Sequence, residues 1–145
     1  MFDELDIKTI SSIYGKIEIS SEKKETTLLI LDDIGASLKN GEIQKLLRKL
    51  IFNRRHLKVY IIIMLQSYKS IPLKVRKLFN NIVMFKPSKP EFENLFEELF
   101  ETDKDHAIII MNYVYKESHD YLFLNIDSQR MYKDFDELII HKDED

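Results

Sequence analysis

The stretch LLILDDIG, residues 28–35, joins a continuous apolar run to two adjacent acids and a glycine. The run TTLLIL (26–31) predicts a strand that is buried on both faces, as in a parallel sheet. Asp32 and Asp33 then fall at the carboxyl end of this strand, where open α/β sheets bind their ligands. Asp and Gly are also turn residues, so a simple turn is the plainer interpretation of the same letters. The rest of the sequence bears on whether this is a turn or a site for a metal and a water.

The composition is that of a chain able to build a core. Of the 145 residues 44% are hydrophobic, with only three Gly and three Pro, so we expect one domain over residues 1–145 without a flexible linker. Cysteine is absent, which excludes disulfides and thiolate metal sites and fits a reducing compartment. The longest apolar run, VYIIIML (59–65), is too short to span a bilayer. The acidic start MFDELDIKTI is not a secretory signal, so we expect a soluble intracellular protein that is not secreted.

Charge is segregated along the chain, although the net charge is only −3. Residues 41–90 hold twelve Lys and Arg against one acid, a net charge of +11. Residues 91–145 hold five Lys and Arg against sixteen Asp and Glu, a net charge of −11. The basic middle indicates contact with phosphates or with an acidic neighbour. Neutralisation of the two parts within the fold explains the pattern equally well.

Amphipathic helices alternate with apolar strands after the first strand. Helices are expected over 41–55, 71–81, 89–101 and, with a strand as the alternative, 105–118; further strands are expected over 58–65, 81–86 and 120–127. Residues 1–24 are a lead-in to which no element is assigned, and residues 140–145 form an acidic tail. This alternation predicts the α/β class, with βα units on a mainly parallel sheet.

A buried strand that ends in two acids is the Walker B pattern of P-loop nucleotide hydrolases. The first acid, Asp32, holds Mg²⁺ through the water shell that this ion keeps. The second, Asp33, polarises a water for attack on the terminal phosphate. Gln66 ends the next strand at the same edge of the sheet, and its amide can bridge that water and that phosphate. A loop-capping role is the alternative for Gln66, although Gln is not a favoured turn residue.

With these elements in this order, the sequence resembles the genome-packaging ATPases of poxviruses and giant DNA viruses, a viral branch of the FtsK/HerA ATPases. The resemblance covers about residues 26–140. Its matching elements are Asp32-Asp33, Arg55-His56, Gln66-Ser67-Tyr68, Ile71-Pro72, Arg76, Asn80, YLFLNID (121–127) and YKDFDELI (132–139). It implies a partial P-loop NTPase fold of the RecA/FtsK type, with three layers.

The resemblance also implies an activity, that of an ATP hydrolase moving viral double-stranded DNA into capsids. It implies Mg²⁺ held by Asp32, and ATP bound by Asp32, Asp33 and Gln66. Asp33 and Gln66 would be catalytic, as the acid that activates water and the sensor of the terminal phosphate. The implied place of action is the cytoplasm of the host, in the viral factory, or the virion.

Such ATPases act as homo-oligomeric rings around duplex DNA, and an arginine of one subunit completes the site of the next. Arg55 and Arg76 are the catalytic candidates for this role and Arg54 is a third; the sequence does not choose among them. Each is equally compatible with a surface arginine. His56 is interpreted as a structural or hydrogen-bonding residue and not as a catalyst or metal ligand.

The phosphate-binding loop G-x-x-x-x-G-K-[ST] of this family does not occur in these residues. The glycines are Gly15, Gly35 and Gly41, and YGKIE (14–18) lacks the first glycine and the Ser/Thr of the loop. The resemblance implies that the strand bearing the loop lies beside the strand 58–65, which then has an open apolar edge. We therefore interpret the chain as the Walker B half of a packaging ATPase core, inactive alone, which needs a separate chain that carries the P-loop.

Two other functions remain open. One is a catalytically inactive ATPase remnant whose basic 41–90 surface binds DNA or an ATPase subunit; salt-dependent DNA binding without ATP turnover would distinguish it. The other is a metal-dependent nuclease with Asp32 and Asp33 as ligands, for which the sequence lacks a well-placed third acid or lysine.

Overall fold

The computed structural model describes residues 5–100 and 103–139, so the predicted acidic tail lies outside the described residues. The chain forms two compact units, which divide between Leu78 and Phe79. Each unit has its own sheet. The prediction of one domain over residues 1–145 stays a prediction. No helix within the described ranges is long and apolar enough to cross a membrane.

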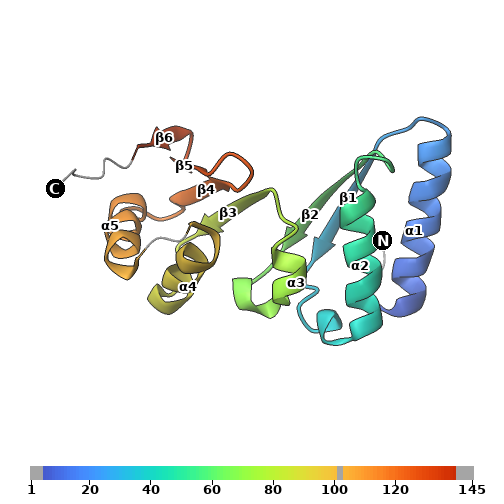
Figure 1. Ribbon diagram of the computed structural model, residues 1–145, viewed down its shortest axis with the longest axis horizontal. Helices are drawn as coiled ribbons and strands as arrows, with labels where there is room; N and C mark the ends of the chain where they lie inside the picture. Colours follow the sequence, from blue (N-terminus) through green and yellow to red (C-terminus); the bar gives the residue numbers. More distant parts are fainter. Residues whose placement is uncertain (1–4, 101–102, 140–145) are drawn as a thin grey trace. The chain divides into compact units, whose positions relative to one another are not determined.

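The first unit is a two-stranded parallel sheet with helices on one side. Its elements are α1 (Ile7–Glu22), β1 (Thr27–Asp32), η1 (Ser37–Lys39), α2 (Gly41–Asn53), β2 (Val59–Met64), η2 (Tyr68–Ser70) and α3 (Leu73–Arg76). β1 and β2 pair from Thr27 opposite Val59 to Asp32 opposite Met64. Figure 1 shows α1 and α2 packed together on one side of the two strands. The predicted α/β class and the predicted parallel pairing of these two strands are confirmed.

Helix α1 forms in the lead-in, where the sequence interpretation had assigned no element. Its N-cap is Asp6, whose carboxylate accepts a hydrogen bond from the backbone N–H of Thr9 at 2.6 Å. Ile10, Ile13 and Ile17 are buried at spacings of three and four residues. This isoleucine spacing behind an Asp N-cap is the signal that could have predicted the helix.

The prediction that β1 is buried on both faces is wrong for the described chain. Leu31 is 6% exposed, whereas Leu28 and Ile30, on the opposite face, are 57% and 53% exposed. β2 alternates in the same way, from the buried Val59 to the exposed Tyr60. The physical reason is that helices pack on one face of the β1–β2 sheet only. Side chains of a strand alternate between the two faces, so every second one stays exposed to solvent.

The two helices predicted on either side of β2 have different outcomes. α2 confirms the first: Asn40 caps it, and its buried side chains are Ile43, Leu47, Leu50 and Ile51. The second, predicted over 71–81, is shorter than expected. It is reduced to α3, and beyond it the N–H of Leu78 bonds to the carbonyl of Val75, three residues back, as in a 3₁₀ turn.

The second unit is an antiparallel sheet with two helices. Its elements are β3 (Asn81–Phe85), α4 (Lys89–Phe100), α5 (Lys104–Val114), β4 (Tyr121–Asn125), β5 (Arg130–Lys133) and β6 (Asp136–Leu138). The strand order is β3-β4-β5-β6, and every pair is antiparallel, so the parallel pairing expected along the chain stops at β2. The helix expected over 89–101 is confirmed. Of the two alternatives for 105–118, the structure has the helix.

Three aromatic side chains contribute to the core of the second unit. Phe92 and Phe96 are fully buried and stack with their ring centroids 4.5 Å apart. The hydroxyl of Tyr115 donates to the carbonyl of Met84 at 2.9 Å. Burial raises the pKa of Tyr115 well above its ordinary value. The phenol therefore stays protonated and joins α5 to β3 as a hydrogen-bond donor.

Candidate active site

The carboxyl ends of β1 and β2 bring the predicted acids and the predicted glutamine together. Asp32 is the last residue of β1 and pairs with Met64. The backbone N–H of Asp33 donates to the carbonyl of Met64 at 3.0 Å, which extends the ladder by one residue. Gln66 Nε2 then donates to Asp33 Oδ2 at 3.3 Å. All three side chains belong to exposed residues, so they are open to a ligand from solution.

The backbone at Asp33 turns sharply, with φ of 48°. Residues other than glycine rarely adopt this left-handed region, and Asp is among those that tolerate it. In a continuing strand, Asp32 and Asp33 would point to opposite faces of the sheet. The turn at Asp33 breaks that alternation, and the second carboxylate meets Gln66. The stretch therefore contains a turn, as the plainer interpretation held, and that turn shapes the cluster.

Close packing holds the loop after β1 against the loop after β2. A Cβ atom added at Gly35 would lie 3.0 Å from Cβ and 3.1 Å from Oγ of Ser70. The Ser70 hydroxyl in turn donates to the carbonyl of Ser67 at 2.6 Å. Gly35 does not have a positive φ. The approach of Ser70, and not an unusual backbone angle, explains why this position has no side chain.

The candidate arginines lie at two different ends of the sheet. Arg54 and Arg55 precede β2 at its amino end, where Arg54 Nη1 donates to the carbonyl of Ile51 at 2.9 Å. With a rise of about 3.3 Å per residue along β2, they lie about 20 Å from Gln66. Arg76 ends α3, in the segment that leaves the carboxyl end of β2, and its guanidinium carbon is 4.6 Å from the ring centroid of Tyr68. Among the three, Arg76 is the one that follows the end of the sheet where Asp33 lies.

Two other residues of the quoted pattern have structural contacts. The backbone carbonyl of His56 accepts a hydrogen bond from the hydroxyl of Ser21 at 3.1 Å, which ties the end of α1 to the turn before β2. In the second unit, Asn80 Nδ2 donates to Asp127 Oδ2 at 2.7 Å, and its carbonyl accepts from Ile126 N at 2.8 Å. Asn80 therefore holds the turn that follows β4.

The chemistry of the acid cluster suits Mg²⁺ that arrives with a nucleotide. Mg²⁺ keeps several waters and is bound in such sites by one or two carboxylates together with phosphate oxygens. Asp32 and Asp33 offer these carboxylates at an exposed edge. Within residues 5–100 and 103–139, no group of three or more His, Cys, Asp or Glu could hold a metal by itself. The donor set therefore fits a shared Mg²⁺ better than a cage made by the protein alone.

The segment YGKIE does not form a phosphate-binding loop. It lies inside α1, where the backbone N–H groups are engaged in the helix. A Cβ atom at Gly15 would meet no heavy atom within 4 Å, so no close approach requires this glycine. Residues 14–18 are therefore helical and do not form a loop of the G-x-x-x-x-G-K-[ST] type.

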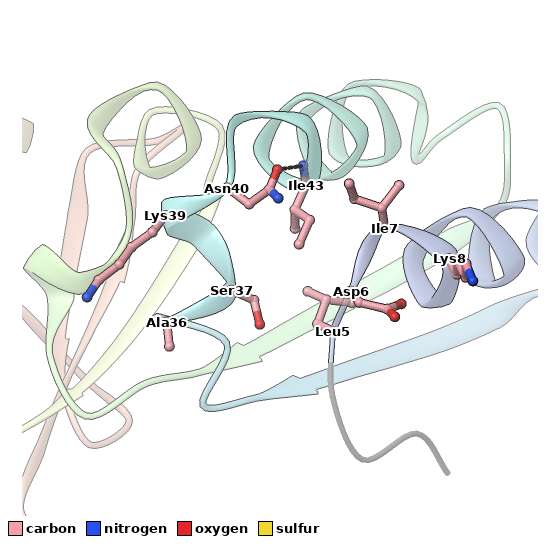
Figure 2. A pocket seen from close by; sticks show the side chains of 9 residues that line it. All are labelled: Leu5, Asp6, Ile7, Lys8, Ala36, Ser37, Lys39, Asn40 and Ile43. Atoms are coloured by element: carbon pink, nitrogen blue, oxygen red, sulfur yellow. Dashed lines mark hydrogen bonds between the residues drawn. The ribbon is translucent and has the colours of Figure 1, made fainter.

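A pocket of about 470 Å³ lies elsewhere, between the start of α1 and the start of α2 (Figure 2). It is lined by Leu5, Asp6, Ile7, Lys8, Ala36, Ser37, Lys39, Asn40 and Ile43. Two helix N-termini border it, and the side chains of Asp6 and Asn40 already cap them. No residue of the acid cluster lines it, so this pocket is separate from the predicted site.

Comparison with known proteins gives one family and one fold. The family model described as Poxvirus A32 protein matches residues 5–144. No sequence among the curated proteins matches this chain. The DNA-packaging ATPase B204 from Sulfolobus turreted icosahedral virus is 16% identical with a TM-score of 0.73, and the match covers 97% of this chain and 65% of that one.

The genome packaging NTPase B204 from Sulfolobus turreted icosahedral virus 2 is also similar in structure to this chain. Its structure in complex with AMP is 17% identical with a TM-score of 0.66, over 91% of this chain and 63% of that one. Its structure in complex with ATP-gammaS is also 17% identical with a TM-score of 0.66, and the match covers 88% of this chain and 60% of that one. At these identities the likeness shows the fold alone. The chain spans less than two thirds of the length of these solved structures.

Proposed function

We propose that this chain, which belongs to the Poxvirus A32 protein family, forms the magnesium and water end of the ATP site in a viral genome-packaging motor. The observation that carries the proposal is the contact between Gln66 and Asp33 at the carboxyl ends of two parallel strands. Ligands of open α/β sheets bind at this edge. One B204 protein whose fold this chain shares is named as a DNA-packaging ATPase. The other is named as a genome packaging NTPase and was solved in complex with AMP and with ATP-gammaS.

Each residue of the cluster has a separate task in this proposal. Asp32 holds Mg²⁺, which when bound offsets negative charge on the phosphates. Asp33 orients the attacking water and accepts its proton. Gln66 contacts the same water and the terminal phosphate with its amide. Because Gln66 is already hydrogen-bonded to Asp33, the two groups are positioned before the nucleotide arrives.

The arginines at the amino end of β2 fit a role between subunits. Arg54 and Arg55 are about 20 Å from their own Gln66, which is beyond the reach of an arginine side chain. An arginine there can complete only the site of a neighbouring copy, as a ring of subunits would require. Arg76 follows the same sheet end as Asp33, so its placement allows a role within its own subunit.

The phosphate-binding loop belongs, in this proposal, to polypeptide outside these 145 residues. More than a third of the length of each B204 chain lies outside the part that matches. Among the described residues, β2 pairs only with β1, and its other edge is open. A strand added there in parallel would end about 4.8 Å from the end of β2. A loop that follows such a strand lies beside Gln66, where phosphates need backbone N–H donors.

Calorimetric titration with Mg-ATP tests the division of the site. The chain by itself lacks the loop, so we expect no saturable binding up to about 1 mM nucleotide. Addition of the P-loop-bearing polypeptide is expected to restore binding, and Asp32→Asn is expected to weaken it in that assembly. The isolated chain with Asp32→Asn is the matched control, because it should behave as the parent chain does. Saturable binding by the isolated chain at about 1 μM would contradict the proposal.

A second candidate function is a DNA-binding module without turnover. The exposed side of α2 bears Lys45 and Arg48, and residues 41–90 have a net charge of +11. Fluorescence anisotropy with a labelled DNA duplex at several salt concentrations measures this. The double substitution of Lys45 and Arg48 by Glu is expected to weaken binding and flatten its salt dependence. The same change at the exposed Lys104 and Lys116, which lie outside residues 41–90, controls for net charge alone.

A further inference from the structure

The side of the β1–β2 sheet away from the helices is an apolar surface. Five side chains form it, which we call the open face: Leu28 is 57% exposed, Ile30 53%, Tyr60 70%, Ile62 48% and Met64 45%. The register sets Leu28 beside Tyr60 and Ile30 beside Ile62. The side chains therefore stand in two adjacent columns, one on each strand, and make a continuous patch.

Such a surface is unusual for a parallel sheet. Parallel strands are nearly always covered on both faces, because their crossover connections place helices there. The covered face of this sheet meets that expectation, with Leu31 and Val59 at 6% and 4% exposure. A contiguous exposed patch of large apolar side chains is typical of a surface that packs against a protein, a membrane or a ligand.

We infer that the open face is the docking surface for the polypeptide that carries the phosphate-binding loop, and that a helix of it packs across both columns. The inference rests on the proposed function and adds where the missing part binds. Met64 of the open face pairs with Asp32, so a helix that follows the strands along this face reaches the acid cluster. The loop and the helix that follows it can then contact the phosphates and the sheet together.

The length of the B204 chains favours a loop-bearing polypeptide, and not a second copy of this chain, as the partner that packs on the open face. More than a third of each B204 chain lies outside the match, so the fold that this chain shares belongs, in those proteins, to a larger polypeptide. A second copy packed face to face would cover the same five side chains, but it would bring no phosphate-binding loop to Asp33. A loop-bearing polypeptide covers the apolar face and completes the acid cluster in one step.

Photocrosslinking in the cells that make the chain tests this assignment. p-Benzoylphenylalanine replaces Tyr60 on the open face, or Phe52 of α2, which is 76% exposed, as the matched control. We expect a crosslink from position 60 to a peptide of a polypeptide that contains G-x-x-x-x-G-K-[ST], and a clearly lower yield from position 52. A crosslink to a second copy of residues 5–139, or equal yields at both positions, overturns the inference.

A substitution on the open face separates docking from folding. Ile62→Lys removes an apolar side chain that is half exposed in the isolated chain, so the thermal midpoint of that chain should stay unchanged while the crosslink at position 60 is lost. If Ile62→Lys does not fold, Leu28→Lys serves the same purpose in the other column. An undiminished crosslink in the folded variant would show that the open face is not the contact.

The docking surface and the proposed activity fail in different ways. One outcome is that the crosslink forms while the assembly made with the unsubstituted chain does not hydrolyse ATP. In that case the docking surface is supported and the proposed activity is wrong. If the assembly hydrolyses ATP while Ile62→Lys changes neither the crosslink nor the assembly, the activity stands and the surface is wrong.

Discussion

Gln66 and Asp33, which are 33 residues apart in the chain, are joined by a hydrogen bond of 3.3 Å from Nε2 to Oδ2. The bond exists because β1 and β2 pair in parallel, with the register that sets Asp32 opposite Met64. A slip of one residue in this pairing would move every side chain of one strand to the other face. The arrangement of the predicted site therefore depends on the register of the sheet and on the packing of the two loops that follow it.

Gly35→Val is expected to separate these two loops. The added side chain starts 3.0 Å from Ser70 Cβ, so Ser70 and the loop after β2 must move. Overpacking of this kind destabilises by about 1–3 kcal/mol, and the resonance of the Gln66 side-chain amide should shift with it. Urea unfolding and NMR of the isolated chain measure both effects.

Gly15→Ala is the control for the glycine substitution. Its new Cβ would meet nothing within 4 Å, and its position is inside α1. Alanine is a better helix former, so this variant is expected to be more stable by about 0.5–1 kcal/mol. Equal effects at Gly35 and Gly15 would show that the contact with Ser70 does not matter.

Leu47→Ala and Leu28→Ala are expected to differ strongly although both remove the same atoms. Leu47 is fully buried in α2, and its loss creates a cavity that costs about 2–5 kcal/mol. Leu28 is 57% exposed on the open face, so its truncation should have a small effect on the isolated chain. Urea denaturation compares them directly. A large loss at Leu28 would indicate that the open face is already covered in the isolated chain.

Acid is expected to destabilise the fold through carboxylates that bind backbone N–H groups. Hydrogen bonds of this kind hold the pKa of Asp6, Asp103 and Asp120 below the ordinary value. Because the folded-state pKa is the lower one, this stabilisation is complete above the unfolded pKa of about 3.9 and is lost as the pH falls through the folded pKa. Unfolding followed by circular dichroism from neutral pH to strong acid should show this loss.

Asp103→Asn isolates one of these groups. Asp103 caps α5 through the N–H of His106 and pairs with its ring at 2.6 Å. Asn retains a capping oxygen but has no charge, so the acid-dependent part of the stability should shrink. Asp105→Asn, in the first turn of the same helix, changes the charge equally and leaves the capping carboxylate of Asp103 in place. An identical pH dependence of the two variants would rule out the capping carboxylate as the cause.

The strongly patterned parts of the fold could be predicted from the sequence. α2 and α4 follow from apolar spacing, and β1 and β2 follow from runs of large apolar residues that end at Asp32 and before Gln66. The exposure of Leu28 and Ile30 could not be predicted. A strand that is buried on both faces and a strand with one uncovered apolar face have the same apolar sequence pattern. α1 has helical isoleucine spacing, but the same segment contains Gly15 and four serines, which lower helix propensity and weaken the signal.

The candidate site could be predicted only in its composition. Strand ends locate Asp32, Asp33 and Gln66 at one edge of the sheet, which the structure shows. The turn at Asp33 and the packing of Ser70 on Gly35 depend on three-dimensional contacts that spacing does not reveal. The same holds for the arginines: their positions in sequence do not indicate that Arg55 and Arg76 belong to opposite ends of β2.

The rate of ATP hydrolysis by the complete assembly, with Asp33→Asn in this chain, is the most direct measurement. If Asp33 activates the attacking water, turnover should fall by about 10²–10⁴-fold while Mg-ATP binding is kept, because the amide cannot accept the proton. Asp127→Asn, in the second unit, is the matched control and should leave turnover near that of the parent. Turnover that is unchanged by Asp33→Asn would contradict the assignment of the ATP site to these strands.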